Sequence, residues 1–233
     1  MAHNKRYFLP GETYFISQQG QGGNLCFFDD ACFEHYLTRI VNCLKVYQVQ
    51  LHSFALLPNE IYLLMTPSTP TGISSLLKAV GNAYVQYYNN RFERSGILWK
   101  GPFNSCLIPN SGSVVECQKY IELAPVRARL VSRPGEYRWS AYCINAFGGH
   151  GIRVTMHDQY KEFGARSSNR FRQYRDYVNC PVNRDQLRLM EHRLHYGYPP
   201  LPVQHGVRSV RVIRKFRYSP PSPVRSAGMA ISV

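Results

Sequence analysis

The stretch "LLPNEIYLLM" (residues 56–65) has the pattern of a tight β-hairpin. Apolar segments flank Pro58 and Asn59, two residue types that favour turns. The pattern predicts one strand at residues 50–57 and a second at residues 61–66. This hairpin is expected to form part of a small antiparallel sheet.

The sequence on either side predicts the rest of the sheet and its helices. Further strands are expected at residues 12–19, after a Pro-Gly turn, and at residues 104–108. Apolar residues at spacings of three and four predict helices that begin at Asp29, at Ile73 and near Ser113. The order β-α-β-β-α-β-α predicts an α+β fold, a ferredoxin-like antiparallel sheet with helices on one face.

We expect three parts along the chain. Residues 1–148 form the sandwich, and residues 149–205 form a small helical extension in which "RDQLRLMEHRLHYG" is a clear helical segment. Residues 206–233 contain six cations and no acid, with several prolines and serines among them. This composition predicts a disordered basic tail, for which backbone phosphates are the natural ligand.

Composition limits the class of protein. The 233-residue chain is 44% hydrophobic, as a globular protein is, and no apolar run approaches the roughly 18 residues of a membrane span. The N-terminal "MAHNKRYFLP" lacks the apolar segment of a signal peptide. Seven cysteines form no Cys-x-x-Cys pair, which favours reduced thiols over disulfides or a zinc site. We therefore expect a cytoplasmic protein with no membrane partner.

The chain is strongly basic. It has 28 Lys and Arg against 14 Asp and Glu, a formal net charge of +14. Such an excess favours a polyanion such as nucleic acid, because each neutralised phosphate releases counterions. A basic solvated surface without a ligand is the alternative. The 17 tyrosines favour nucleic acid, since aromatic rings offer stacking surfaces for bases.

Five segments, in order and spacing, resemble the REP-associated tyrosine transposases, a branch of the single-tyrosine HUH transposases. They are "PGETYFIS", "LHSFALLPNEIYLL", "YVQYYNNRFERSGILWKGPF", "KYIELAPVRARLV" and "RPGEYRWSAY". They span about residues 7–145, and a looser likeness continues through "EHRLHYGYPPL". The resemblance implies a DNA partner, single-stranded or hairpin, and a Mg²⁺ or Mn²⁺ ion held by a His-x-His motif. In the family this ion polarises the scissile phosphate, and a tyrosine attacks it to form a phosphotyrosyl link.

By position, Tyr120 matches the nucleophile of the family, and it lies in a predicted helix as the resemblance requires. A phenol with a pKa of ~10 is a weak nucleophile at neutral pH, so the metal and the positioning must supply most of the activation. The alternative for Tyr120 is an aromatic side chain that packs at the edge of the core.

The metal positions depart from the family pattern. Where relatives carry Pro-Asn-His-x-His, this chain has Glu60, Ile61 and Tyr62 after Pro-Asn. Residues i and i+2 of a strand share a face, so the pairing is kept, but only Glu60 offers a ligand suited to Mg²⁺ or Mn²⁺. Ala124 replaces a polar residue, commonly Asn, one turn beyond the nucleophile. We expect a degenerate site that binds neither ion, with His52 either a substitute ligand or a packed histidine.

The segments that face DNA in the resemblance contain candidate contacts. Phosphate contacts are expected from six cations, and base stacking from two aromatic side chains. The cations are Arg91, Arg94, Lys100, Lys119, Arg127 and Arg129, and the aromatic residues are Tyr88 and Trp99. Arg129 stands where relatives usually carry Gly. Trp139 is expected to pack in the core.

These observations leave three classes of function. The leading hypothesis is a DNA-binding protein of the tyrosine transposase family, with strand cleavage impaired by the changed metal positions. The alternative is an active transposase that cleaves and rejoins single-stranded DNA through a Tyr120 phosphotyrosyl intermediate. The third class is a basic structural or interaction protein without a DNA ligand.

Overall fold

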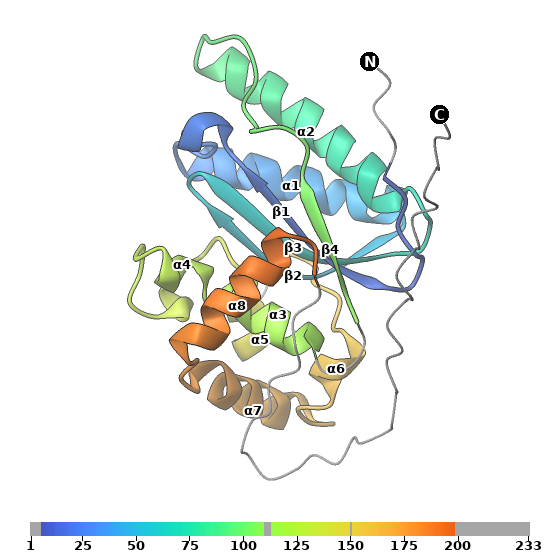
Figure 1. Cartoon of the computed structure of the whole chain (residues 1–233), viewed down its shortest axis with the longest axis vertical. Helices are drawn as coiled ribbons and strands as arrows, with labels where there is room; N and C mark the ends of the chain where they lie inside the picture. The colour runs from blue at the N-terminus through green and yellow to red at the C-terminus, as the bar shows by residue number, and fades with distance from the viewer. Residues whose placement is uncertain (1–5, 110–112, 150, 199–233) are drawn as a thin grey trace, which may run out of the picture. The chain divides into compact units, whose positions relative to one another are not determined.

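A four-stranded antiparallel sheet forms the centre of the chain (Figure 1). The computed structural model describes residues 6–109, 113–149 and 151–198. In the spatial order β2-β3-β1-β4, the strands are β2 Val49–Leu57, β3 Glu60–Pro67, β1 Thr13–Gln19 and β4 Asn104–Ile108. All four predicted strands are confirmed, and their ends differ from the prediction by at most one residue.

The register of the inner strands places the residues of interest on one face. β2 and β3 form the predicted hairpin. β3 also pairs with β1, where Ser17 lies opposite Tyr62 and Gln19 lies opposite Glu60. Alternate side chains of a strand share a face, so these four residues lie on the same side of the sheet as Phe15.

The outer edge of β2 is hydrogen-bonded to segments from later in the chain. The Leu56 N–H donates to the Trp139 carbonyl at 2.9 Å, and the Thr155 N–H donates to the Leu51 carbonyl at 2.7 Å. The ring of Trp139 stacks on Phe33 with centroids 4.9 Å apart, and its side chain is buried. The expected core position of Trp139 is confirmed.

Two long helices cover one face of the sheet (Figure 1). α1 (Asp30–Val46) begins after Asp29, whose carboxylate accepts a hydrogen bond from the Cys32 N–H at 3.0 Å, the usual role of an N-cap aspartate. α2 spans Gly72–Arg91. α1 contacts β2, and α2 contacts β2 and β3. Apolar side chains of this face, such as Leu63, are fully buried.

A second helical layer lies on the opposite face. α3 (Ser113–Glu122) contacts three of the strands, and its Tyr120 ring lies against Phe15. The short α4 (Ala124–Arg127) follows. The α+β class is confirmed, but helices occupy both faces of the sheet, whereas only one covered face was expected. In β1 the adjacent residues Phe15 and Ile16 point to opposite faces and are both buried, so each face needs a cover.

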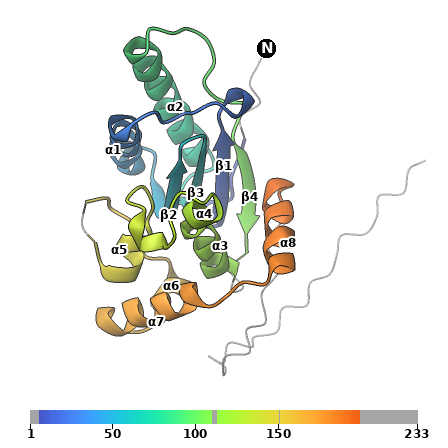
Figure 2. The same ribbon diagram turned by 90° about the vertical axis from the view of Figure 1, so that its left-hand side faces the viewer.

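Four further α-helices follow the sandwich within the residues that the structure describes. They are α5 Tyr142–Phe147, α6 Asp158–Lys161, α7 Ser167–Asn179 and α8 Arg184–His195, and α8 runs alongside β4 (Figure 2). The predicted tail, residues 206–233, lies outside the described residues, and the division at residue 148 stays a prediction. Among the helices that the structure describes, none has the length and apolar character to cross a bilayer. All seven cysteines carry free thiols.

A buried carboxyl group joins α3 to the helices that follow it. Glu122 is fully buried, and its Oε1 accepts hydrogen bonds from Ser53 Oγ at 2.9 Å and Asn145 Nδ2 at 2.7 Å. Its Oε2 accepts from the Tyr174 hydroxyl at 2.7 Å. Burial raises the pKa of Glu122 to about 7, although these hydrogen bonds lower it. The carboxyl is thus the polar centre of the contact between β2, α3, α5 and α7.

Candidate functional site

Tyr120 lies over the sheet near the end of α3. Its ring makes edge contacts with Phe15 and Tyr62, with centroids 6.1 Å apart in both pairs. The Arg127 guanidinium lies 3.8 Å from the centroid of the Tyr120 ring, and its Nη1 donates to the Tyr120 carbonyl at 2.5 Å. The fold thus brings the predicted nucleophile position and a predicted metal position into contact, with Tyr120 only 5% exposed.

The surroundings of Tyr120 keep its phenol protonated at neutral pH. Burial raises the pKa of Tyr120 to about 12; Arg127 lowers it, and Glu191 and Glu60 raise it. A protonated phenol attacks a phosphodiester only with help from a base or from an electrophile on the phosphate. Burial therefore makes unaided attack by Tyr120 less favourable than attack by a solvated tyrosine.

The two predicted metal positions interact with each other instead of presenting free ligands. Glu60 accepts a hydrogen bond from Gln19 Nε2 at 3.2 Å and is hydrogen-bonded to Tyr62. Burial raises the pKa of both Glu60 and Tyr62. Ala124 is buried and has no side-chain ligand atom. These residues do not fit a Mg²⁺ or Mn²⁺ site, and within the described ranges no three His, Cys, Asp or Glu side chains are placed to hold a metal ion.

His52 belongs to a separate hydrogen-bond network at the far end of β2. Its Nδ1 lies 2.8 Å from the Thr155 carbonyl, and its Nε2 lies 2.8 Å from Thr66 Oγ1. Thr66 Oγ1 is 2.8 Å from Thr13 Oγ1, which is 3.2 Å from His157 Nε2. Burial lowers the pKa of His52 to about 4. Since both ring nitrogens have protein partners, His52 is the packed histidine of the two alternatives.

A pocket of about 360 Å³ is lined by Tyr120 and the metal positions Glu60 and Tyr62, and also by residues of α8. The sheet and α3 contribute Glu60, Tyr62 and Tyr120 to its lining. From α8 the lining includes Arg188, Glu191, His192 and His195. Sequence analysis did not identify the α8 residues as part of a site. The available signal was the looser likeness through "EHRLHYGYPPL", which contains three of them.

In sequence, the chain matches no protein-family model and no curated protein. In structure, it is similar to a REP-associated tyrosine transposase solved bound to a REP hairpin, with a TM-score of 0.54 and 17% identity over 68% of this chain and 96% of that chain. The shared feature is the fold. A putative transposase from Deinococcus radiodurans (TM-score 0.36, 16% identity, covering 52% of this chain and 96% of that one) also matches. tRNA(His) guanylyltransferase from Saccharomyces cerevisiae matches with a TM-score of 0.40 and 11% identity, covering 78% of this chain and 83% of that one. Both of these structures are too dissimilar to carry an argument.

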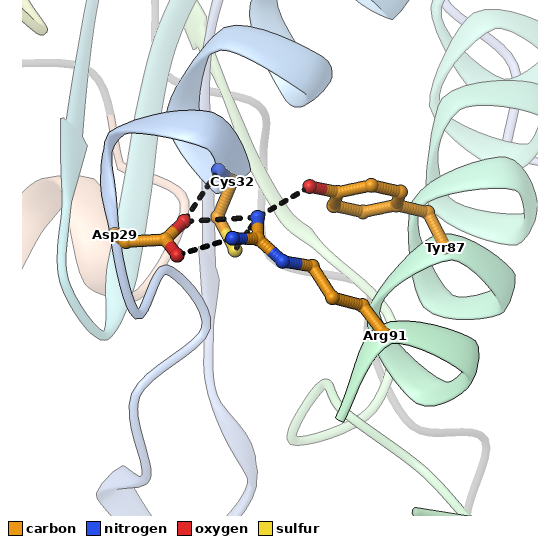
Figure 3. A network of polar contacts seen from close by, with 4 residues as sticks. All are labelled: Asp29, Cys32, Tyr87 and Arg91. Carbon is orange, nitrogen blue, oxygen red and sulfur yellow. Dashed lines mark hydrogen bonds and ion pairs between the residues drawn. The ribbon is translucent and has the colours of Figure 1, made fainter. Parts of the chain in front are cut away.

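Arg91, a predicted phosphate contact, is held in an ion pair (Figure 3). Its Nη2 lies 2.6 Å from Asp29 Oδ2, and its Nη1 donates to the Tyr87 hydroxyl at 2.6 Å. The contact joins the beginning of α1 to the end of α2. The charge of Arg91 is already offset by Asp29, which leaves Arg91 a weaker candidate than a cation without an acidic partner.

Four other predicted cations remain placed for contact with a ligand. Arg94, Lys100 and Arg129 are exposed, and Arg127 is half-buried on the ring of Tyr120. Arg94 and Lys100 lie on the loop between α2 and β4, whereas Arg127 and Arg129 lie in and just after α4. The positive candidates therefore form two groups, one on the loop between α2 and β4 and one at the end of α4.

Three of the predicted DNA contacts are buried in the structure. The Lys119 ammonium donates to the carbonyls of Tyr177 and Cys180 at 2.8 Å each, and Lys119 is 2% exposed. This lysine binds carbonyl groups at the end of α7, as cations commonly do at a helix C-terminus. Trp99 is 9% exposed and packs among core aromatic rings, and Tyr88 is also buried. None of the three presents its functional group to a phosphate or a base.

Arg129 adopts a backbone conformation that favours glycine, with φ at 58°. A side chain in this left-handed region costs about 1 kcal/mol relative to glycine. We expect Arg129→Gly to raise the free energy of unfolding by about 1 kcal/mol, as measured by urea denaturation. The matched control is Arg133→Gly, at φ −133°, where added chain flexibility should lower stability. Equal effects at the two positions would contradict a conformational cost at Arg129.

Proposed function

We propose that this protein is a DNA-binding protein of transposase descent that recognises hairpin or single-stranded DNA and whose metal-dependent strand cleavage is impaired. The fold is shared with a transposase bound to a REP hairpin, and the chain carries a net charge of +14. The observation that carries the proposal is the set of residues at the positions that hold the cation in the resemblance. Two of these positions line a pocket together with Tyr120 and contain a hydrogen-bonded carboxyl group, Glu60, and a phenol, Tyr62. The third position is the buried Ala124, whose side chain is a methyl group.

The proposal includes the absence of Mg²⁺ or Mn²⁺ from the working protein. Mg²⁺ keeps several of its waters and binds through carboxylates and phosphates in near-octahedral geometry. Glu60 is the only such ligand at the three positions, and its oxygens already accept from Gln19 and interact with Tyr62. A single carboxylate in this state competes poorly with water for the ion. The tyrosine is thus kept without the electrophile that would activate its target.

The alternative is an active transposase that cleaves single-stranded DNA through Tyr120. The retained tyrosine, in contact with residue 62 and within the pocket, favours this alternative. It requires a covalent protein–DNA adduct that is lost in Tyr120→Phe. Incubation of the full chain with hairpin DNA and Mn²⁺, followed by denaturing electrophoresis, decides between the two, and we expect no adduct.

DNA binding itself is tested with labelled hairpin, single-stranded and duplex DNA across a range of salt concentrations. Joint substitution of Arg94, Lys100 and Arg129 with alanine is expected to weaken hairpin binding and to lower the slope of log affinity against log salt by about 2–3, because each phosphate contact contributes about 0.7–0.9. The control is Arg39→Ala with Arg172→Ala, two exposed cations on α1 and α7. Absence of salt-dependent binding to any of the three DNAs would favour the basic interaction protein instead.

A further inference from the structure

α8 presents one line of side chains to the core and a second to the Tyr120 pocket. Leu187, Met190 and Leu194 pack into the hydrophobic core that the sheet and its helices form, and Leu194 is 2% exposed. The pocket is lined by Arg188, His192 and His195, spaced four and three residues apart. Residues at these spacings lie on one face of a helix. The apolar line therefore anchors α8, and the second line faces the site that lost its metal ligands.

We propose that Arg188, His192 and His195 form a phosphate-binding site that takes the place of the divalent ion, so that a DNA phosphodiester binds in the Tyr120 pocket without metal. This inference rests on the proposed DNA-binding function and adds the residues that would hold the strand there. It assigns a ligand-binding role to α8 of the helical extension, whereas the metal positions of the resemblance include residues 60 and 62 of β3.

The chemistry of the lining suits a phosphodiester. Arg188 offers a planar set of N–H donors that matches phosphate oxygens, and a histidine offers a ring N–H donor in either charge state. The Arg127 guanidinium lies 3.8 Å from the centroid of the Tyr120 ring, and this ring lines the pocket. The rings of Phe15 and Tyr196 also line the pocket, and the Tyr196 ring lies 4.5 Å from that of His192 and 5.1 Å from that of His195, between centroids. Positive groups with aromatic rings between them are the usual composition of a site for single-stranded nucleic acid.

The pocket also has room for a ligand larger than an isolated anion. At about 360 Å³ it exceeds the space that one phosphate group needs, and it lies in the range typical of small-ligand sites. A phosphate on the α8 donors leaves room for the attached sugar or base beside the aromatic rings. This favours a nucleotide within a strand over a free inorganic ion.

Two carboxyl groups, Glu60 and Glu191, line the pocket and would repel an anion when charged. Removal of such a charge should therefore change the affinity in opposite directions for a phosphate site and for a cation site. Glu60 is hydrogen-bonded to Gln19 and Tyr62, so its carboxyl oxygens already have protein partners. Glu191 is exposed on α8 and is close enough to raise the pKa of both Glu60 and Tyr120. A phosphate site should bind more tightly once Glu191 is neutral. A cation site would lose a ligand by the same change.

The first experiment measures the affinity of the full chain for labelled hairpin DNA in EDTA. Joint substitution of Arg188, His192 and His195 with alanine is expected to weaken binding at least tenfold, and Arg188→Gln alone severalfold, with a salt slope lower by about 1. Arg39→Ala is the matched control, since it removes an exposed cation from α1, on the other face of the sheet. Circular dichroism melts establish that α8 remains folded, and Arg188→Gln decides the outcome if the triple variant unfolds.

The second experiment reverses the charge change. Glu191→Gln is expected to tighten hairpin binding about threefold or more, and Mn²⁺ is expected to leave the affinity of the wild-type protein unchanged. Weaker binding of Glu191→Gln together with tighter binding in Mn²⁺ would show a cation site and overturn the proposal. If the wild-type protein binds hairpin DNA but the α8 variants bind equally well, the inference fails and the proposed function stands. If the wild-type protein binds no DNA, the proposed function itself fails.

Discussion

The triple variant Glu60→His, Tyr62→His, Ala124→Asn is expected to form a covalent adduct with single-stranded hairpin DNA in Mn²⁺, whereas the wild-type protein forms none. The two positions on β3 share a face with Phe15, and Tyr120 lies in contact with that face. Two imidazoles at residues 60 and 62 and an amide at residue 124 would restore the ligand types that the resemblance gives to the metal site. Metal polarisation of a phosphodiester contributes several kcal/mol, on the order of 10³-fold in rate.

All three changes are needed for this gain. A single histidine at residue 60 would leave the phenol at residue 62 and the methyl group at residue 124, so two of three ligands would still be missing. The adduct is measured by denaturing electrophoresis after incubation with Mn²⁺. Adding Tyr120→Phe to the triple variant is expected to abolish the adduct, and EDTA should do the same. An adduct in the wild-type protein, or in the triple variant without metal, would contradict the proposal that the changed metal positions impair cleavage.

Glu122→Ala is expected to lower the free energy of unfolding by about 4 kcal/mol, the largest stability effect that the fold predicts. The substitution removes the acceptor for Ser53, Asn145 and Tyr174, all of which are buried. Each buried group left without a partner costs about 1–3 kcal/mol, and the space left by the side chain adds to this. Urea denaturation at pH 7 measures the loss.

Glu122→Gln isolates the ionisation of the same group. Because the folded-state pKa is raised from 4.5 to about 7, the folded protein keeps a proton that the unfolded chain has released between these pH values. The contribution of Glu122 to stability is therefore fully present below pH ~4.5, falls as pH rises, and is lost above pH ~7. The glutamine variant should gain about 3 kcal/mol relative to the wild type between pH 4.5 and 7.5.

The stability of the variant must be compared with that of the wild type at each pH, because His52 gives stability a pH dependence opposite to that from Glu122. Its pKa is lowered to about 4, so its contribution to stability is lost as pH falls from about 6.5 to 4. Both proteins contain His52, and its effect cancels in the difference. The control is Glu162→Gln, which makes the same change at an exposed carboxyl group on the surface. A flat difference for Glu122→Gln would show that the buried carboxyl titrates normally.

The sheet and its first three helices could be predicted from sequence because their signals are local. The Pro58-Asn59 turn, flanked by apolar residues, determines the hairpin, and apolar spacing of three and four marks the helices. The resemblance assigned Tyr120 to the nucleophile position on a helix, and the structure places the Tyr120 ring 6.1 Å from the ring of Tyr62. Local patterns did not indicate that α3 covers the second face, because that depends on which strand side chains need burial.

The direction of individual side chains could not be predicted in the same way. Lys119 and Trp99 have the residue types of DNA contacts, but the structure buries one against the end of α7 and the other in the core. Both outcomes depend on contacts with residues far along the chain. The same holds for His192 and His195, which reach the Tyr120 pocket from α8. Their spacing in the sequence predicts that they lie on one face of a helix. Only the tertiary structure shows that this face lines the Tyr120 pocket.

The bonded outer edge of β2 has a consequence for the behaviour of the protein in solution. An edge strand with free N–H and carbonyl groups can recruit a strand from another molecule, which leads to aggregation. Here the backbone groups of Leu51 and Leu56 are already bound by Thr155 and Trp139 of the same chain. Intermolecular β-augmentation at this edge therefore requires residues 139–155 to detach first, so truncations within that segment should make the protein prone to precipitate.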